Sequence, residues 1–279
     1  MRGPGVGGRV AGLSRGSRVA GGFLLVVILL ALTGALLPER WVQGVDLSRR
    51  LVGPSEAWPL GTDELGRAIV WRLWRGATLS LGVAATAVLF SATIGSTLGL
   101  FAGERGGLFD GVLGKLIDLV LAFPGLLLAV ALAAVLGPAA LNTVLALSAV
   151  GWVPYARLAR TEARRVAALD YVAAARSSGA GKGRLLFRHL LPNIAAPLVV
   201  QGTLHLAGAI LAESALSFLG VGVPPPAPSW GAMLAAGRTH ILDAPHVVLA
   251  PAAAILVVVL ATNALGDALV ARLDTAGKG

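Results

Sequence analysis

Cysteine is absent from the sequence of 279 residues. Its absence excludes disulfide bonds and any metal site or nucleophile that depends on a thiolate. Charged residues are scarce, at 13% of the chain against about 25% in soluble domains. Acidic residues are fewer than basic ones, which leaves a net charge of +9, yet no basic stripe interleaved with aromatic residues is present. We therefore expect no nucleic-acid partner.

The chain also lacks the groups expected of an enzyme. Its four histidines contain no pair at i, i+4 spacing that would suit a metal. Residues 179–182 look like part of a phosphate-binding loop, but Arg176 stands at the position of the leading glycine and Gly183 follows the lysine. A nucleophile–base pair within the apolar segments is not evident either. We expect no catalytic residue, no cofactor and no metal in this chain.

What the sequence does contain is apolar residues, at 56% of the chain. Six apolar segments are each long enough to cross about 30 Å of hydrocarbon at about 1.5 Å per residue. Backbone groups in lipid must be hydrogen-bonded within the segment, so we expect helices. The fold class predicted is an all-α membrane protein with six transmembrane helices, at residues 19–37, 79–102, 116–136, 139–156, 194–215 and 247–265.

The basic residues predict the orientation of these helices. An even number of spans places both termini on one side, and with the termini inside, the cytoplasmic parts hold sixteen of the 23 Lys and Arg residues against seven outside. This excess favours cytoplasmic termini. The expected organisation begins with a basic cytoplasmic tail (1–18), a first transmembrane helix (19–37) and an extracytoplasmic segment (38–76). A five-helix core (77–270), which contains a cytoplasmic coupling loop at 161–192, and a second cytoplasmic tail (271–279) follow.

The loop after the fourth segment has the most informative pattern in the chain. Residues 164–178 are rich in Ala and Arg, which favour helix, and Gly179 can end that helix in the left-handed conformation. An amphipathic pattern restarts at residues 182–191, and Pro192 is expected to stop it. We expect a helix–glycine–helix knuckle that is presented to a cytoplasmic partner.

The loop resembles the EAA loop of binding-protein-dependent ABC import permeases. More closely, the chain is similar to the dipeptide/oligopeptide/nickel permease family, in its shorter, second-permease branch. The resemblance covers nearly the whole chain beyond residue 19. The matching motifs are 59–67 with 75–77, 118–124, 213–220 with 225–231, and 263–267 with Asp274.

The resemblance implies a type I ABC importer permease fold and a subunit that is not itself an enzyme. The implied partners are a second homologous permease, two cytoplasmic ATPase subunits that hydrolyse ATP, an extracytoplasmic solute-binding protein, and the lipid of a bacterial or archaeal inner membrane. Di- or oligopeptides are the expected solutes, and nickel or another small solute is the alternative. A stand-alone secondary transporter would need membrane carboxylates arranged as an ion relay, which the sequence largely lacks.

Candidate site residues follow from the resemblance and from the rarity of polar groups in the spans. The expected ATPase-coupling loop comprises Asp170, Ala173, Ala174, Ala175, Gly179, Arg188, Leu191 and Pro192. The family has Glu at the position of Ala173, and Asp170, one turn earlier, is the candidate substitute.

A second set of candidates lies within the fifth segment. Gln201 and His205 are four residues apart and therefore share a helix face, which would either line the translocation path or hydrogen-bond between helices. Glu213 is expected to gate the path, lock a helix or serve as a structural hydrogen-bonding group. Asp118 and Asp267 are expected to be structural. Residues 224–228 with Trp230 are expected to form a stiff outward loop carrying an interfacial aromatic residue.

Overall fold

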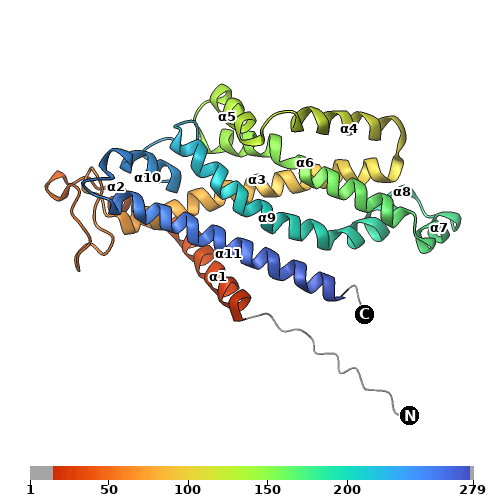
Figure 1. Cartoon of the computed structure of the whole chain (residues 1–279), viewed down its shortest axis with the longest axis horizontal. Coiled ribbons are helices and arrows are strands. Elements are labelled where there is room, and N and C mark those ends of the chain that lie inside the picture. The colour runs from red at the N-terminus through yellow and green to blue at the C-terminus, as the bar shows by residue number, and fades with distance from the viewer. Residues whose placement is uncertain (1–14, 277–279) are drawn as a thin grey trace, which may run out of the picture.

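The computed structural model describes residues 15–276, and this part of the chain contains helices and connecting turns but no β-strand. The bundle is elongated, with α7 (Asp170–Ser177) at one end of its long axis and α2 (Glu39–Gln43) and α10 (Trp230–Gly237) at the other (Figure 1). We refer to these as the α7 end and the α10 end. The predicted all-α fold class is confirmed.

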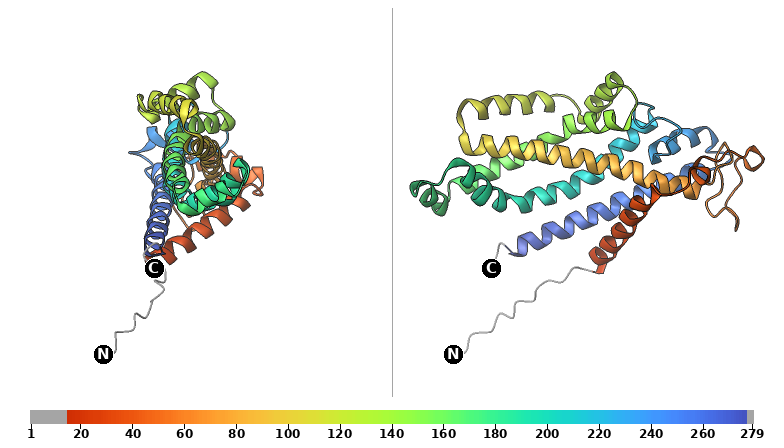
Figure 2. Two further views of the ribbon diagram at one scale, coloured as in Figure 1. Left: turned by 90° about the vertical axis from the view of Figure 1, so that its right-hand side faces the viewer. Right: turned by 180° about the vertical axis from the view of Figure 1, so that it is seen from behind.

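The longer helices form the body of the bundle. They are α1 (Arg15–Gly34), α3 (Ile69–Arg105), α4 (Gly107–Leu121), α6 (Ala140–Ala167), α9 (Leu191–Phe218) and α11 (His246–Ala276). Figure 2 shows α4 and α5 (Gly125–Leu136) on one side of the bundle and α1 and α11 on the opposite side. The start of α1 and the end of α11 both point away from the α10 end (Figure 1).

Three helical stretches in the described residues are long and apolar enough to cross a bilayer: Ile69–Arg105, Leu185–Phe218 and His246–Ala271. The pair formed by α4 and α5 adds a fourth if it is counted as one broken span. The described apolar part of α1 is shorter, at Leu25–Gly34. The count of six spans therefore stays a prediction.

The one helix expected at residues 116–136 is divided into α4 and α5. The chain begins this helix at Gly107 and bends by 87° between α4 and α5. Pro124 lies at the break as the N-cap of α5, with an extended backbone (ψ 122°). Proline cannot donate a backbone hydrogen bond, and it disfavours helical geometry in the residue before it, so the helix ends there and α5 starts in a new direction.

Close packing of α3 against α6 forms the centre of the bundle. Gly95, Gly99 and Gly103 recur every fourth residue of α3 and face the backbone of α6. A Cβ atom at Gly103 would lie 2.6 Å from the carbonyl oxygen of Arg160. Small residues at this spacing let two helices approach closely in a membrane, where van der Waals packing replaces the hydrophobic effect.

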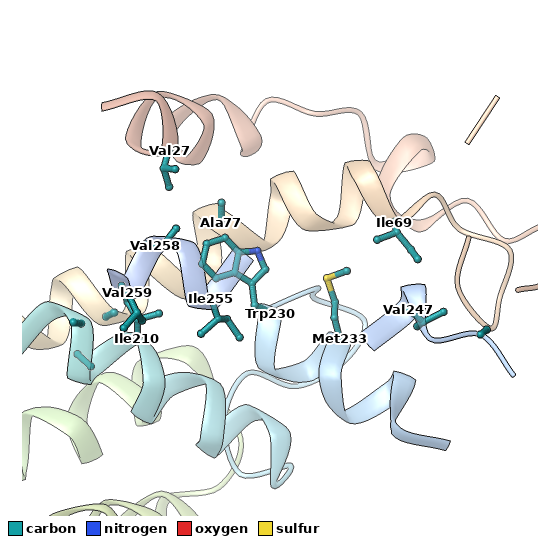
Figure 3. Close-up of a cluster of buried hydrophobic side chains, with 14 residues drawn as sticks. Val27, Ile69, Ala77, Ile210, Trp230, Met233, Val247, Ile255, Val258 and Val259 are labelled. Atoms are coloured by element: carbon teal, nitrogen blue, oxygen red, sulfur yellow. The ribbon is translucent and has the colours of Figure 1, made fainter. Parts of the chain in front are cut away.

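Trp230 anchors the core at the α10 end. Its ring lies between Ala77 of α3 and the residues Ile255 and Val258 of α11 (Figure 3). The indole Nε1 donates a hydrogen bond to the carbonyl oxygen of Leu73 at 3.0 Å. Only 2% of Trp230 is exposed, so the expectation of an interfacial aromatic residue is wrong. A partner for the indole N–H is what permits this burial.

A buried charge network fixes the segment before α3. The side chain of Asp63 contacts Arg67 Nε at 2.7 Å and Arg72 Nε at 3.3 Å. Its other carboxylate oxygen accepts the backbone N–H groups of Leu65 and Arg67, both at 2.9 Å. The η1 turn (Leu47–Arg49) joins the same region, because the backbone N–H of Asp46, its N-cap, donates to the carbonyl oxygen of Leu65 at 3.0 Å. This segment is thereby tied to the start of α3.

Candidate functional site

The knuckle predicted at residues 164–192 exists, but its helices divide differently. The helix expected at 164–178 is two helices, α6 and α7, because Leu169 is extended (ψ 143°) between them. Gly179 has φ +81°, as expected for a residue that ends a helix. The N–H of Ala180 donates to the carbonyl of Ala175 and that of Gly179 to Arg176, both at 3.1 Å. This pair of bonds is the Schellman arrangement.

The stop expected at Pro192 is wrong. The chain runs from α8 (Lys182–Arg184) through the π-helix η2 (Leu185–Leu190) into α9 without a break. The N–H of Leu191 donates to the carbonyl of Leu186, five residues earlier. Pro192 lies in the first turn of α9, directly after the π-helix, and the helical stretch continues through it. The η2 and α9 segments therefore form one continuous helical stretch, Leu185–Phe218.

An apolar core holds the knuckle against the bundle. Val172 of α7 is fully buried, and so are Leu190 at the end of η2 and Ile194 in α9. They pack with Leu100 of α3 and with buried residues of α6 and η2, namely Ala159, Ala163, Val166, Leu185 and Leu186. The apolar pattern that predicted the second knuckle helix thus faces inward.

Three ion pairs connect the α7 end to neighbouring helices. Asp110 at the start of α4 contacts both Arg160 and Arg164 on α6. Glu104, near the end of α3, lies 3.8 Å from Arg176 of α7. An acidic partner for the knuckle therefore comes from α3, since Ala173 itself carries no carboxylate.

The outer surface of the knuckle carries the other expected coupling residues. Asp170, Ala173, Ala174, Gly179, Arg188 and Pro192 are exposed, while Ala175 and Leu191 are partly buried. Sequence reasoning missed two aromatic residues on this surface, Tyr171 at 45% and Phe187 at 65% exposure. The signal was present in the pattern, because Phe187 is the large apolar residue that falls outside the inward face of η2.

A groove between α5, α6 and α9 contains the histidine expected in the path. Its volume is about 200 Å³, and its walls consist mostly of Gly, Ala and aliphatic residues, with His205 as the polar side chain. His205 Nδ1 lies 3.2 Å from the hydroxyl of Tyr155 on α6. Gln201 is half-buried and lies outside the lining of this groove. Tyr155 was missed, because its separation of 50 residues from His205 hides the contact.

Glu213 is buried at the α10 end among four serines. The hydroxyl of Ser217 donates to its carboxylate at 2.8 Å, and Ser214 lies at 3.5 Å. Ser80 of α3 and Ser229, the N-cap of α10, lie beside this carboxylate. The hydroxyls of Ser80, Ser217 and Ser229 each accept a backbone N–H in turn, from Trp230, Val223 and Ala232 respectively. The arrangement joins α3, α9 and α10.

Two further acidic residues lie at the surface of the described chain. Asp118 on α4 and Asp267 on α11 are both exposed. The side chain of Asp274, which belongs to the last matching motif, falls outside the described residues. Within the described part of the chain, no group of three or more His, Asp or Glu residues could hold a metal ion.

Comparison with known proteins identifies the family. Residues 95–276 match the family of the binding-protein-dependent transport system inner membrane component. The chain is 43% identical over 264 residues to the di/tripeptide transport system permease protein DppC of Pseudomonas aeruginosa. The matched region covers 91% of this chain and 86% of that protein. It is 41% identical to the dipeptide permease DppC of Alkalihalophilus pseudofirmus, over 88% and 81% of the two chains. It is also 40% identical to the glutathione permease GsiD of Pectobacterium atrosepticum, over 91% and 85%.

Solved structures support the same fold. An inward-facing structure of the MetNI methionine ABC transporter matches with a TM-score of 0.58 and 17% identity, over 73% of this chain and 97% of the matched chain. The ABC importer permease fold predicted from the sequence is confirmed. The chain is a multi-pass membrane protein, and it belongs to the family of inner membrane components of binding-protein-dependent transport systems.

Proposed function

We propose that this chain is one of two homologous permease subunits in an ATP-driven importer of di- or oligopeptides. The second permease completes the translocation pathway. A solute-binding protein delivers the peptide at the α10 end, and two ATPase subunits bind at the α7 end. The observation that carries the proposal is the knuckle, a surface-exposed helical pair that is continuous with a long apolar helix.

The relatives supply the solute class. The names of two of them specify dipeptides or di/tripeptides, and that of a third specifies glutathione, itself a small peptide. All three cover more than four fifths of this chain. A peptide is therefore a better supported solute than nickel for this chain.

The distribution of basic residues supports a cytoplasmic α7 end. Arg157, Arg164, Arg165, Arg176, Arg184 and Arg188 lie on or beside the knuckle. Lys and Arg concentrate in the cytoplasmic segments of membrane proteins. Both termini are then cytoplasmic, and residues 38–68 are extracytoplasmic.

Coupling works through the rigid connection between knuckle and membrane. When two ATPases close on ATP, they press on the exposed face of α7 and η2, which includes Tyr171 and Phe187. Because η2 continues into α9, this displacement moves α9 relative to its neighbours. Reversing the population of two states from 1:99 to 99:1 requires about 5.5 kcal/mol, which differential ATP binding must supply. Asp170 contributes a carboxylate at the start of α7.

The pathway runs along the α5–α9 side of the bundle in this proposal. His205 lines it, Gln201 lies one turn closer to the knuckle, and Glu213 secures its α10 end. The apolar, exposed surface of α4 and α5 then faces the second permease or lipid; it includes Leu108, Leu119, Phe123, Leu126 and Leu127.

The test is ATPase docking to knuckle variants in the assembled transporter. Gly179→Val forces a β-branched residue into a backbone with φ +81°, and Phe187→Ala removes an exposed aromatic side chain. We expect both to reduce the yield of ATPase that co-purifies with the permease and to reduce ATP-driven peptide uptake. Leu242→Ala is the control for ATPase yield, because Leu242 is also an exposed apolar residue but lies at the opposite end.

Undiminished ATPase yield in both knuckle variants would contradict the docking role. Peptide uptake that persists in vesicles without ATP or ATPase subunits would contradict the importer mechanism as a whole. Normal membrane insertion of each variant, measured by its level in the membrane fraction, ensures that a lost partner rather than a misfolded permease is being measured.

A further inference from the structure

The contact between Tyr155 and His205 assigns a hydrogen-bonding role to one atom of the groove. Tyr155 is fully buried, and its hydroxyl has His205 Nδ1 as its hydrogen-bond partner among the described residues. Either group can donate in this bond, according to the tautomer of the imidazole. When Tyr155 donates to Nδ1, the proton of the neutral imidazole lies on Nε2, and the free edge of His205 is then a hydrogen-bond donor.

That free edge lies at the wall of the groove. A Cβ atom at Gly151, which lines the groove, would lie 2.6 Å from His205 Cε1 and 3.0 Å from Nε2. The absence of a side chain at Gly151 is thus what makes room for the imidazole. The same hypothetical atom would lie 2.5 Å from Ser91 Oγ on α3. Ser91 is fully buried, and its hydroxyl has no hydrogen-bond partner among the described residues.

We propose that His205 Nε2–H is a specificity-determining donor that binds a main-chain carbonyl oxygen of the passing peptide, with Tyr155 as the residue that positions it. This inference rests on the proposed function and adds to it the atom that recognises the solute. Ser91 supplies a further polar group next to Gly151. A neutral carbonyl fits better than a terminal carboxylate, because the groove lining contains no Lys or Arg to balance a charge.

The shape of the groove supports recognition of the main chain. Its volume of about 200 Å³ is below the range of roughly 300–1,000 Å³ for pockets that enclose a whole ligand. It therefore contacts one side of a solute. The walls at Gly125, Ala129, Gly208 and Ala212 have small or no side chains, which lets a peptide backbone approach. A site that contacts the backbone of the peptide tolerates different side chains on that peptide.

The test compares two solutes in the complete transporter, reconstituted in vesicles with its ATPases and binding protein. One is a dipeptide, and the other is the same dipeptide with a thioamide, whose sulfur is a weaker acceptor than oxygen. The ratio of their ATP-driven uptake rates is measured in the unmodified protein and in His205→Leu. Effects of the binding protein on the ratio are identical in both, so they cancel when the ratios are compared.

We expect the unmodified protein to transport the amide several-fold faster, in line with the loss of one hydrogen bond, and His205→Leu to lose this preference. His205→Gln keeps a donor and should retain part of it. Tyr155→Phe removes the bond that fixes the tautomer, so its preference should be intermediate. Leu211→Ala, an exposed position on α9 outside the groove lining, should leave the ratio unchanged.

Two results would overturn the inference, and they are distinguishable. If the unmodified protein shows normal uptake and His205→Leu keeps the full preference, the assignment of His205 is wrong while the importer function stands. If the unmodified assembly shows no ATP-driven uptake of either solute, the proposed function fails, and this inference fails with it. An amidated dipeptide that lacks a terminal carboxylate but retains the preference would support the main-chain carbonyl; loss of the preference would contradict it.

Discussion

The two ends of the bundle are held together by different interactions. At the α10 end, Asp63 and Glu213 are buried carboxylates with several polar contacts: Asp63 contacts Arg67 and Arg72, and Glu213 contacts Ser214 and Ser217. At the α7 end, the contacts are mainly apolar, through buried side chains such as Val172 and Leu190. The ion pairs there involve partly exposed arginines, including Arg164 and Arg176.

The difference suits the proposed roles of the two ends. Directional hydrogen bonds to buried charges have one favourable geometry, so they resist displacement. Apolar contacts are non-directional and allow packed helices to slide by small amounts. An end that must move when an ATPase pushes on it is better held by the second kind of contact. The following three substitutions test this contrast, from the largest expected effect to the smallest.

Asp63→Asn should have the largest effect on stability. It removes the charge that balances Arg67 and Arg72 while keeping the shape of the side chain. Leaving buried cations unpaired costs about 3–5 kcal/mol. The free energy of unfolding in detergent micelles, measured by denaturant titration with circular dichroism, should fall by that order.

Glu56→Gln is the matched control for Asp63→Asn, because Glu56 is an exposed carboxylate in the same segment. It should change the unfolding free energy by less than about 0.5 kcal/mol. Equal stability of the two variants would show that the Asp63 network does not fix the α10 end.

Leu190→Ala should loosen the α7 end selectively. Leu190 is fully buried in the knuckle core, and truncation of a buried leucine costs about 2–5 kcal/mol. Trypsin should then cut faster at Arg176 and Arg184 on the knuckle than in the unmodified protein. Cleavage at Arg40 and Arg50 near the α10 end should keep its original rate. Equal acceleration at both ends would mean that the ends are not independent.

Arg176→Ala should have the smallest effect. The arginine is about half-exposed, and its 3.8 Å contact with Glu104 is long. Exposed pairs of this kind contribute about 0–1 kcal/mol and are screened by salt. A double-mutant cycle with Glu104→Gln should give a coupling energy in that range. A coupling energy well above it would mean that the α7 end also depends on ion pairs.

Local signals in the sequence were sufficient for much of the fold. The positions of α3, α6, α9 and α11 followed from apolar segments, and Gly179 was identified as a helix terminator with its left-handed backbone. Proline was the main source of error. Pro124 lies at the break between two helices where one was expected, whereas Pro192 lies within a continuous helical stretch that it was expected to end. The effect of a proline depends on which carbonyl groups lose their hydrogen-bond donor, and this depends on the conformation of the neighbouring turns.

The candidate site was predicted only in part, because its local features are visible in the sequence and its long-range contacts are not. The knuckle is a local feature, and its Ala, Gly and Leu pattern is readable within thirty residues. Its exposed aromatic residues, Tyr171 and Phe187, could not be separated from inward-facing ones until the π-helix fixed the direction of each side chain. Trp230 was assigned to the surface because its partner, the carbonyl of Leu73, is 157 residues away.

The sequence by itself determined that this protein is helical and membrane-embedded, and its motifs determined the family. These properties depend on composition and on short-range pattern, which are the same whether or not the chain is folded. Only the tertiary structure decided that Tyr155 meets His205, that Asp63 balances two arginines, and that Glu213 lies beside Ser80 of α3 and the N-cap of α10. Such contacts exist only after the close approach of helices like α3 and α6 has brought distant segments together.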